Sequence, residues 1–188
     1  MCIRDSTITE DEGPKNARPD KIPNLRPVFT KDGTVTAANA SSINDGAAAL
    51  VVMKKSEAEK NGYKILAEIV SHAAHAHEPA YFTTAPVPAM KKALAKAGWT
   101  ADEVDLWEIN EAFAVVPLIA MQELGLDHDK VNVNGGACVL GHPIGASGAR
   151  IITTLIAAME KRGARKGVAS LCIGGGEATA VCLEINPA

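Results

Sequence analysis

Three segments of the sequence combine polar or reactive side chains with glycine at the end of a predicted strand. They are NEAFA at residues 110–114, a glycine-rich stretch at residues 134–150 and CIGGG at residues 172–176. Open α/β sheets place their ligand sites at the carboxyl ends of strands. Acid–base catalysis needs a side chain that can take up or release a proton, and a growing oxyanion needs hydrogen-bond donors. His142, Cys172 and the glycine-rich backbone can supply these groups.

Each segment also has a plainer structural interpretation. Asn110 can be the N-cap of a helix that has Glu111 in its first turn, and spacing alone favours this interpretation. His142 can lie in a tight turn, although the five glycines of residues 134–150 exceed what a plain turn needs. Cys172 either exposes its thiol at the strand end or is a buried structural cysteine, as we expect for Cys138 and Cys182.

Three histidines, His72, His75 and His77, have a spacing that could hold a metal ion. No acidic or cysteine partner follows them at a standard interval, so solvated or loop histidines are the favoured interpretation and no metal site is predicted. The glycine-rich stretch could bind an anion, but its spacing matches neither a dinucleotide fingerprint nor a P-loop.

Strands and helices alternate along the chain, which predicts an α/β fold. The pattern predicts strands at residues 47–53, 65–70, 104–109, 131–133, 167–173 and 178–185. It predicts helices at residues 56–62, 88–98 and 110–124, with a kink at Pro117, and a fourth that ends at Gly163. Capping boxes are expected at residues 56–59 and 100–103. The last two strands must be antiparallel because their connection is so short.

Composition excludes several classes of protein. The net charge of −3 comes without a basic stripe, which argues against nucleic acid as a partner. No apolar run approaches the ~20 residues that span a bilayer, so no membrane association is predicted. The four cysteines are interpreted as reduced thiols of a cytoplasmic protein. Residues 7–27 are rich in charge and proline and predict a loop. Residues 1–6 are interpreted as non-native sequence.

Taken together, NEAF at residues 110–113, GHPIG at residues 141–145 and CIGGG at residues 172–176 resemble the three C-terminal motifs of the thiolases, of the acetyl-CoA acetyltransferase type. Two upstream stretches, GTVTAANAS at residues 33–41 and NDGAA at residues 44–48, resemble the coenzyme A-binding region of the family. The resemblance implies a layered α/β/α fold with a mixed sheet. Residues 1–60 would be the end of the N-terminal domain and residues 61–188 the C-terminal domain.

The resemblance also implies a reaction and roles for residues. Thiolases transfer acetyl groups between coenzyme A thioesters, converting two acetyl-CoA into acetoacetyl-CoA and coenzyme A, and need no other cofactor. His142 would activate a nucleophilic cysteine that lies in the N-terminal half of the family, outside this chain. Asn110 would hold a water in an oxyanion hole, Cys172 would exchange the α-proton, and the Gly174 N–H would serve a second oxyanion hole.

Five further residues are expected to bind the substrate. Phe29, Ala37 and Ser41 would contact the pantetheine arm, and Phe82 and Phe113 would line the acyl end of the pocket, which favours short chains. By itself the chain is expected to be inactive and to expose apolar surface. The full-length protein is expected to be a homo-oligomer.

Other interpretations remain open. Ketoacyl synthases share the fold, but they generally carry histidine or asparagine in place of Cys172. A thiolase for longer 3-ketoacyl-CoA chains, or a non-catalytic acyl-CoA-binding fragment, would fit the same motifs. A glycine-rich nucleotide-binding domain fits poorly, because the fingerprint spacing does not occur.

Overall fold

The computed structural model describes residue 7 and residues 9–185, so residues 1–6 and their interpretation as non-native sequence lie outside the described part. The chain forms two compact units, Met1–Ala38 and Asn39–Ala188.

The first unit contains two short helical turns, although a loop was predicted for residues 7–27. Helix α1 spans Glu12–Asn16 and begins where the Asp11 carboxylate accepts a hydrogen bond from the Gly13 N–H at 2.9 Å. A 3-10 helix, η1, follows at Pro19–Asn24. Proline at the first helical position and an aspartate cap are local signals that favour such turns, and the loop prediction overlooked them.

A mixed four-stranded sheet forms the centre of the second unit. Its strands are β1 at Glu68–Ala76, β2 at Leu106–Ile109, β3 at Lys166–Cys172 and β4 at Glu177–Glu184, in the order β1-β4-β3-β2. Strands β2 and β3 are parallel, whereas β4 is antiparallel to both of its neighbours. The predicted α/β class and the antiparallel pairing of the last two strands are thereby confirmed.

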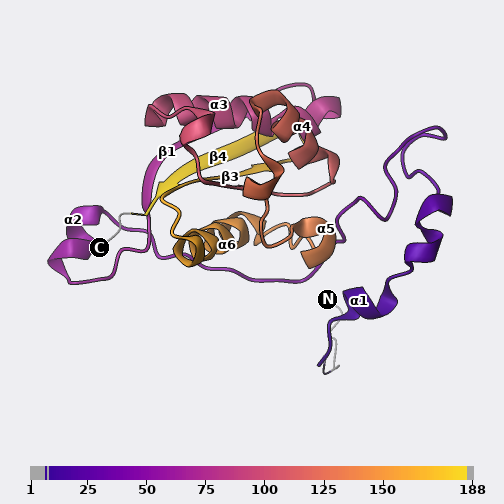
Figure 1. Cartoon of the computed structure of the whole chain (residues 1–188), viewed down its shortest axis with the longest axis horizontal. Coiled ribbons are helices and arrows are strands. Elements are labelled where there is room, and N and C mark those ends of the chain that lie inside the picture. Colours follow the sequence, from indigo (N-terminus) through magenta and orange to yellow (C-terminus); the bar gives the residue numbers. More distant parts are fainter. Residues whose placement is uncertain (1–6, 8, 186–188) are drawn as a thin grey trace. The chain divides into compact units, whose positions relative to one another are not determined.

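Helices cover both faces of this sheet (Figure 1). Helices α3 at Pro86–Ala97 and α4 at Val115–Leu124 lie on one face, and α6 at Ser147–Arg162 lies on the other. Two apolar cores result, one around Trp107, Met90 and Ile109 and the other around Leu155 and Met159. The unit is therefore layered α/β/α, as expected.

Short elements connect these layers. They are α2 at Lys55–Lys60, α5 at Ala137–Leu140 and the 3-10 helices η2 at Pro79–Thr84, η3 at Ala101–Glu103 and η4 at His128–Lys130. Helices α3 and α6 end as predicted, because Gly98 and Gly163 adopt left-handed φ angles of 68° and 65°. The predicted capping box between Thr100 and Glu103 is also present.

Several predicted elements differ in the structure. Residues 47–53 and 131–133 form no strand, and the strand predicted at residues 65–70 begins at Glu68 and continues to Ala76. Helix α2 has Lys54 as its N-cap and receives no side-chain cap, so the capping box predicted at residues 56–59 is wrong. Pro117 lies in the first turn of α4, where no intrahelical donor is lost, and therefore produces no kink.

The described residues contain no helix that is both long enough and apolar enough to cross a membrane.

Candidate active site

Two of the predicted catalytic residues lie at the same edge of the sheet because β2 and β3 are parallel. Asn110 directly follows β2, and its N–H donates to the Ser170 carbonyl at 2.9 Å. Cys172 is the last residue of β3, two positions beyond Ser170. The carboxyl ends of parallel neighbours meet at one edge, which is where open α/β sheets place their sites.

The segment after β2 is not a helix, and so the interpretation of Asn110 as an N-cap is wrong. Its backbone pairs instead with residues 39–41. The Ser41 N–H and hydroxyl both donate to the Ala112 carbonyl, at 3.1 and 2.9 Å, and the Ala114 N–H donates to the Asn39 carbonyl at 2.9 Å. These bonds hold residues 110–114 in a non-helical path, and α4 begins at Val115.

Asn132 fixes the position of this segment from the other side. Its side-chain oxygen accepts from the Ile109 N–H at 2.8 Å, and its amide nitrogen donates to the Ile109 carbonyl at 2.8 Å. The same nitrogen donates to the Glu111 carboxylate at 2.9 Å. The side chain thereby takes the place of a neighbouring strand at the end of β2. Asn132 has a φ of 48°, a conformation that asparagine tolerates better than most residues.

His142 is held in a loop that approaches Asn110. Its backbone N–H donates to the Ser42 carbonyl at 2.8 Å, and the preceding Gly141 has a φ of 88° and packs against Asn44. A side chain at Gly141 would collide with Asn44, so this glycine is required by close approach as well as by conformation. An unusual backbone angle, as expected for a glycine of this stretch, is thus observed at Gly141, where the close neighbour is Asn44.

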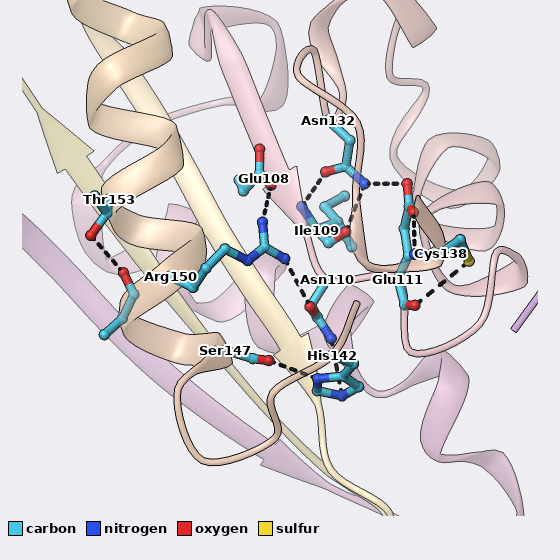
Figure 2. A network of polar contacts seen from close by, with 11 residues as sticks. Glu108, Ile109, Asn110, Glu111, Asn132, Cys138, His142, Ser147, Arg150 and Thr153 are labelled. Carbon is cyan, nitrogen blue, oxygen red and sulfur yellow. Dashed lines mark hydrogen bonds and ion pairs between the residues drawn. The ribbon is translucent and has the colours of Figure 1, made fainter. Parts of the chain in front are cut away.

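The imidazole of His142 contacts one polar group at each ring nitrogen, as Figure 2 shows. Nε2 lies 3.3 Å from the Asn110 amide nitrogen, and Nδ1 lies 2.7 Å from the Ser147 hydroxyl oxygen. Burial lowers the pKa of His142, and the nearby Arg150 guanidinium lowers it further. The histidine is therefore neutral at neutral pH, the form in which it can accept a proton.

An ion pair lies behind Asn110. Arg150, on α6, donates to the Glu108 carboxylate at 3.1 Å and to the Asn110 side-chain oxygen at 3.3 Å. The Glu108 side chain is only 2% exposed. Burial raises the pKa of Glu108 to about 7, although the arginine opposes this shift. Among the described residues, the Nε of Arg150 is the buried side-chain nitrogen that has no hydrogen-bond partner.

Cys172 is buried, at 6% exposure, so the interpretation with an exposed thiol is wrong. Burial raises the pKa of its thiol to about 11. Its resting form is therefore the protonated thiol, which can donate a proton but must lose one before it can act as a base. Cys182 is fully buried, as expected, whereas Cys138 is half-buried beside Glu111, and burial raises the pKa of its thiol to about 11.

Gly174 lies in the exposed turn between β3 and β4, and nothing occupies the space where its side chain would be. The turn is anchored at Gly176, which has a φ of 100° and whose carbonyl accepts from the His77 N–H at 3.1 Å. The turn places Gly174 beyond the end of β3, two residues after Cys172.

The predicted substrate-binding residues are only partly brought together. Phe82 and Phe113 form an edge-on pair with ring centroids 6.0 Å apart, and both pack against the core that contains Cys172. Ser41 belongs to the same unit and is hydrogen-bonded to the Ala112 carbonyl. Phe29 and Ala37 belong to the unit Met1–Ala38.

The three histidines of residues 72–77 lie on or just after β1. His75 and His77 have ring nitrogens 3.4 Å apart, and His75 also contacts the Lys92 ammonium at 3.0 Å. A cation so close disfavours a metal ion there. The described residues contain no group of three or more potential metal ligands.

Sequence reasoning gave no role to Glu108, Asn132, Ser147 or Arg150. A signal existed for Glu108, which is a charged residue inside an otherwise apolar predicted strand. Asn132 and Arg150 could not be found from spacing, because the partners of their side chains are 21 to 42 residues distant in the sequence. The partners of Ser147 are only 4 and 5 residues away, but no spacing rule assigned it a role.

The sequence was compared with known families and proteins. Residues 63–185 match the family model for the C-terminal domain of thiolases, and residues 3–56 match the model for the N-terminal domain. A cytosolic acetyl-CoA acetyltransferase of Mus musculus is 52% identical over 93% of this chain and 45% of its own length.

Solved structures agree with this match. The acetyl-CoA acetyltransferase of Bacillus anthracis superposes with a TM-score of 0.89 at 44% identity, over 98% of this chain and 48% of that one. A thiolase of Ascaris suum, solved in complex with coenzyme A, gives 0.85 at 44% identity, over 95% of this chain and 47% of that one. The chain thus spans about half the length of these relatives. A match of this extent to the C-terminal domain model, in a chain with the α/β/α fold described above, shows that the chain belongs to the thiolase family.

Proposed function

We propose that this chain contributes the proton-transfer and oxyanion-binding side of a thiolase active site. The reaction would transfer an acetyl group between coenzyme A thioesters, reversibly converting two acetyl-CoA into acetoacetyl-CoA and coenzyme A. The observation that carries the proposal is the 3.3 Å contact between Asn110 and His142, which joins two distant motifs at the edge where Cys172 ends β3. No cofactor beyond the thioester substrates is required.

His142 would accept the proton of a nucleophilic cysteine, since burial keeps its imidazole neutral. Neither of its ring nitrogens is bonded to a cysteine of the described residues: Nε2 faces Asn110 and Nδ1 faces Ser147. We propose that the nucleophile comes from the half of the thiolase that this chain does not span. The chain by itself would then be inactive.

Asn110, acting through a water, would stabilise the charge on the thioester oxygen, and His142 would join it while its Nε2 holds the proton taken from the nucleophile. Cys172 would return a proton to the product enolate in the cleavage direction, a role that its raised pKa favours. In the synthetic direction Cys172 must first give up its proton and then remove the α-proton. The exposed backbone N–H of Gly174 would bind the oxygen of the acetyl-enzyme.

Substrate binding is proposed for the residues singled out by the resemblance. Phe29, Ala37 and Ser41 would contact the pantetheine arm. Phe82 and Phe113, which pair edge-on, would close the acyl end, and this favours acetyl and acetoacetyl groups over longer chains. A thiolase with longer 3-ketoacyl-CoA substrates is the alternative, and replacement of Phe82 by alanine should move the preference toward it.

The domain division and the biological setting are also proposals. Residues 1–60 would close the N-terminal thiolase domain and residues 61–188 would form the C-terminal domain, a boundary that lies within the gap at residues 57–62 between the two family-model matches. A homo-oligomer in the cytoplasm is proposed for the full-length protein. The unpaired cysteines 138, 172 and 182 suit a reducing compartment, and the mouse relative is described as cytosolic.

The test is cleavage of acetoacetyl-CoA by coenzyme A, with this chain alone and with a version extended upstream to the length of its relatives. We expect activity only in the extended protein. His142→Ala and Cys172→Ala should each lower kcat at least about a hundredfold, the usual contribution of a general acid or base. Activity of the chain alone would refute the proposed origin of the nucleophile.

Two matched controls separate chemistry from folding. Cys182 lies in the same buried core as Cys172, so Cys182→Ala removes similar packing without touching the proposed site. His128 lies on the exposed turn η4, and His128→Ala should leave activity unchanged. Equal losses in Cys172→Ala and Cys182→Ala would mean that Cys172 acts only by packing. If every version is silent, a non-catalytic acyl-CoA-binding protein becomes the better account.

A further inference from the structure

A continuous series of polar contacts runs from β2 to the loop that holds His142 (Figure 2). It begins at the buried Glu108 carboxylate, passes to Arg150 on α6 and then to the Asn110 amide. From Asn110 it reaches His142 Nε2, and from Nδ1 it reaches the Ser147 hydroxyl. The residues come from three separate elements, so the series depends on the tertiary fold and not on local sequence.

The direction of these hydrogen bonds follows from the arginine. A guanidinium has only donors and remains charged at any ordinary pH, so the group it contacts on Asn110 must be the amide oxygen. A flipped amide would place an NH₂ group against the guanidinium, donor against donor. The amide nitrogen of Asn110 therefore faces His142, and Nε2 of the imidazole has to be the acceptor.

The tautomer of His142 follows in turn. A neutral imidazole has one N–H and one acceptor nitrogen. Because Nε2 accepts, the proton must be on Nδ1, from which it is donated to the Ser147 oxygen at 2.7 Å. The Ser147 hydroxyl then donates its own hydrogen to the Pro143 carbonyl at 3.1 Å. In this arrangement every hydrogen bond of the series joins a donor to an acceptor, from Arg150 through Asn110 and His142 to Ser147.

We infer that Arg150, held by the buried Glu108 carboxylate, is a positioning residue that acts with Ser147 to fix neutral His142 as the Nδ1–H tautomer, with Nε2 unprotonated. Isolated imidazoles of histidine prefer the opposite tautomer, so the arrangement is imposed by the protein. Arg150 contacts Glu108 and Asn110, and Ser147 contacts His142 and Pro143, so both would act through Asn110 and His142.

The catalytic use of this tautomer rests on the proposed function. Nε2 is the nitrogen that would take the proton from the thiol of the nucleophile as the sulfur attacks the thioester carbonyl. That proton would then pass to the departing coenzyme A sulfur, so Nδ1 would keep its proton throughout. A histidine in the other tautomer would present an N–H to the thiol and could not accept its proton.

The test is the ¹⁵N spectrum of the imidazoles in the intact chain, in which protonated and unprotonated ring nitrogens resonate far apart. The His142 signals are assigned by their loss in His142→Ala. We expect Nδ1–H to exceed Nε2–H by at least about tenfold, since the wrong tautomer leaves buried donors unpaired. Arg150→Met and Ser147→Ala should each reduce this ratio several-fold. Arg162→Met, at the exposed end of α6, should not change it.

A second variant keeps the test decisive if Arg150→Met does not fold. Asn110→Asp replaces the amide by a carboxylate, which can only accept, so it should draw a proton onto Nε2 and raise the pKa of His142. Asn134→Asp changes the charge equally at an exposed position nearby and is the control. Predominant Nε2–H in the unaltered chain, or a tautomer ratio indifferent to both Arg150 and Ser147, would overturn the inference.

Measurements of catalysis distinguish a failure of the proposed function from a failure of the positioning role of Arg150. If the extended protein does not cleave acetoacetyl-CoA but its spectrum shows the Nδ1–H form, the proposed function fails and the positioning role stands. If it is active, Arg150→Met should lower kcat more than it changes KM and should alter the pH profile of kcat. A variant with impaired folding alone would lower the active fraction without moving that profile.

Discussion

Two short apolar segments of the second unit, β3 and residues 47–53, differ in structure: the first is a buried strand and the second is an exposed segment without strand pairing. Strand β3 is buried between α6 and the α3–α4 layer, and its Val168 is fully inaccessible. Residues 47–53, AAALVVM, look at least as strand-like in sequence, yet they form no strand, and Val51 and Val52 are 89% and 70% exposed. The difference lies in their neighbours: β3 pairs with β2 and β4, whereas residues 47–53 pair with no strand of the described residues. An apolar run becomes a strand only where another strand can satisfy its backbone.

The segment just before this run behaves differently again. Residues 39–42 pair with the loops that contain Asn110 and His142, through Asn39, Ser41 and Ser42. Backbone pairing with these two loops therefore extends to Ile43 and does not include residues 47–53. In the proposed full-length protein, residues 47–53 would find their strand partners in the N-terminal domain.

Replacement of a valine by aspartate should give the largest difference in the free energy of unfolding between the two segments. Val168→Asp places an unpaired carboxylate in the core and should lower the free energy of unfolding by about 3–5 kcal/mol, enough to unfold many domains. Val52→Asp should change it by less than about 0.5 kcal/mol, because the site is exposed. It should also reduce aggregation by interrupting an exposed apolar run. Chemical denaturation and light scattering measure these effects.

The contrast between the two segments would be contradicted if Val52→Asp lowered the free energy of unfolding as much as Val168→Asp. Residues 47–53 would then be packed in solution, against a second copy of the chain.

Truncation of leucine side chains gives a smaller contrast. Leu155 on α6 is 1% exposed and packs against the sheet, so Leu155→Ala should cost about 2–5 kcal/mol through lost burial and the cavity left behind. Leu66, which precedes β1, is 50% exposed, and Leu66→Ala should cost under about 0.5 kcal/mol. Urea unfolding of the two variants measures the change in the free energy of unfolding, provided that their m-values are equal. A loss at Leu66 as large as that at Leu155 would contradict it.

The same contrast explains how much could be predicted. The elements with strong local signals were found from the sequence, among them α3 and α6 with their terminal glycines and the β3–β4 pair with its tight turn. Residues 47–53 were predicted wrongly, since their local pattern says nothing about whether a partner strand is available. The helix predicted at residues 110–124 forms, but it begins at Val115 and not at Asn110, because pairing with residues 39–41 outweighs the local capping signal.

The candidate site shows the same division. Asn110, His142 and Cys172 were singled out by residue type and by family resemblance, and the parallel pairing of β2 with β3 brings Asn110 and Cys172 to one edge. The burial of Cys172 and the ion pair between Glu108 and Arg150 depend on packing between distant elements. No spacing rule encodes them, and only the folded chain brings these side chains together.

The smallest expected effect concerns Glu108, a charged residue on β2 that is buried in the described part of the chain. Glu108 is buried like Val168, but it has Arg150 as a partner. Burial nevertheless raises its pKa to about 7 from 4.5. A raised carboxyl pKa means that the folded state holds the proton more tightly than the unfolded state. This contribution to stability is therefore present in full below about pH 4.5 and is lost as the pH rises through about 7.

Glu108→Gln keeps an oxygen that can accept from Arg150 and removes the titration. The free energy of unfolding of the unaltered protein should thus fall relative to that of the variant between pH 5 and about 8, and the two curves should run parallel above that range. Glu103→Gln is the control of opposite sign. The bonds of Glu103 to Lys166 and Thr100 lower its pKa to about 2, so its contribution is lost only as the pH falls through that value. Denaturant unfolding at several pH values measures both. If Glu108→Gln left the pH dependence between 5 and 8 unchanged, the Arg150 guanidinium would be strong enough to cancel the effect of burial, and Glu108 would be a fully ionised anchor for Arg150 at every pH in that range.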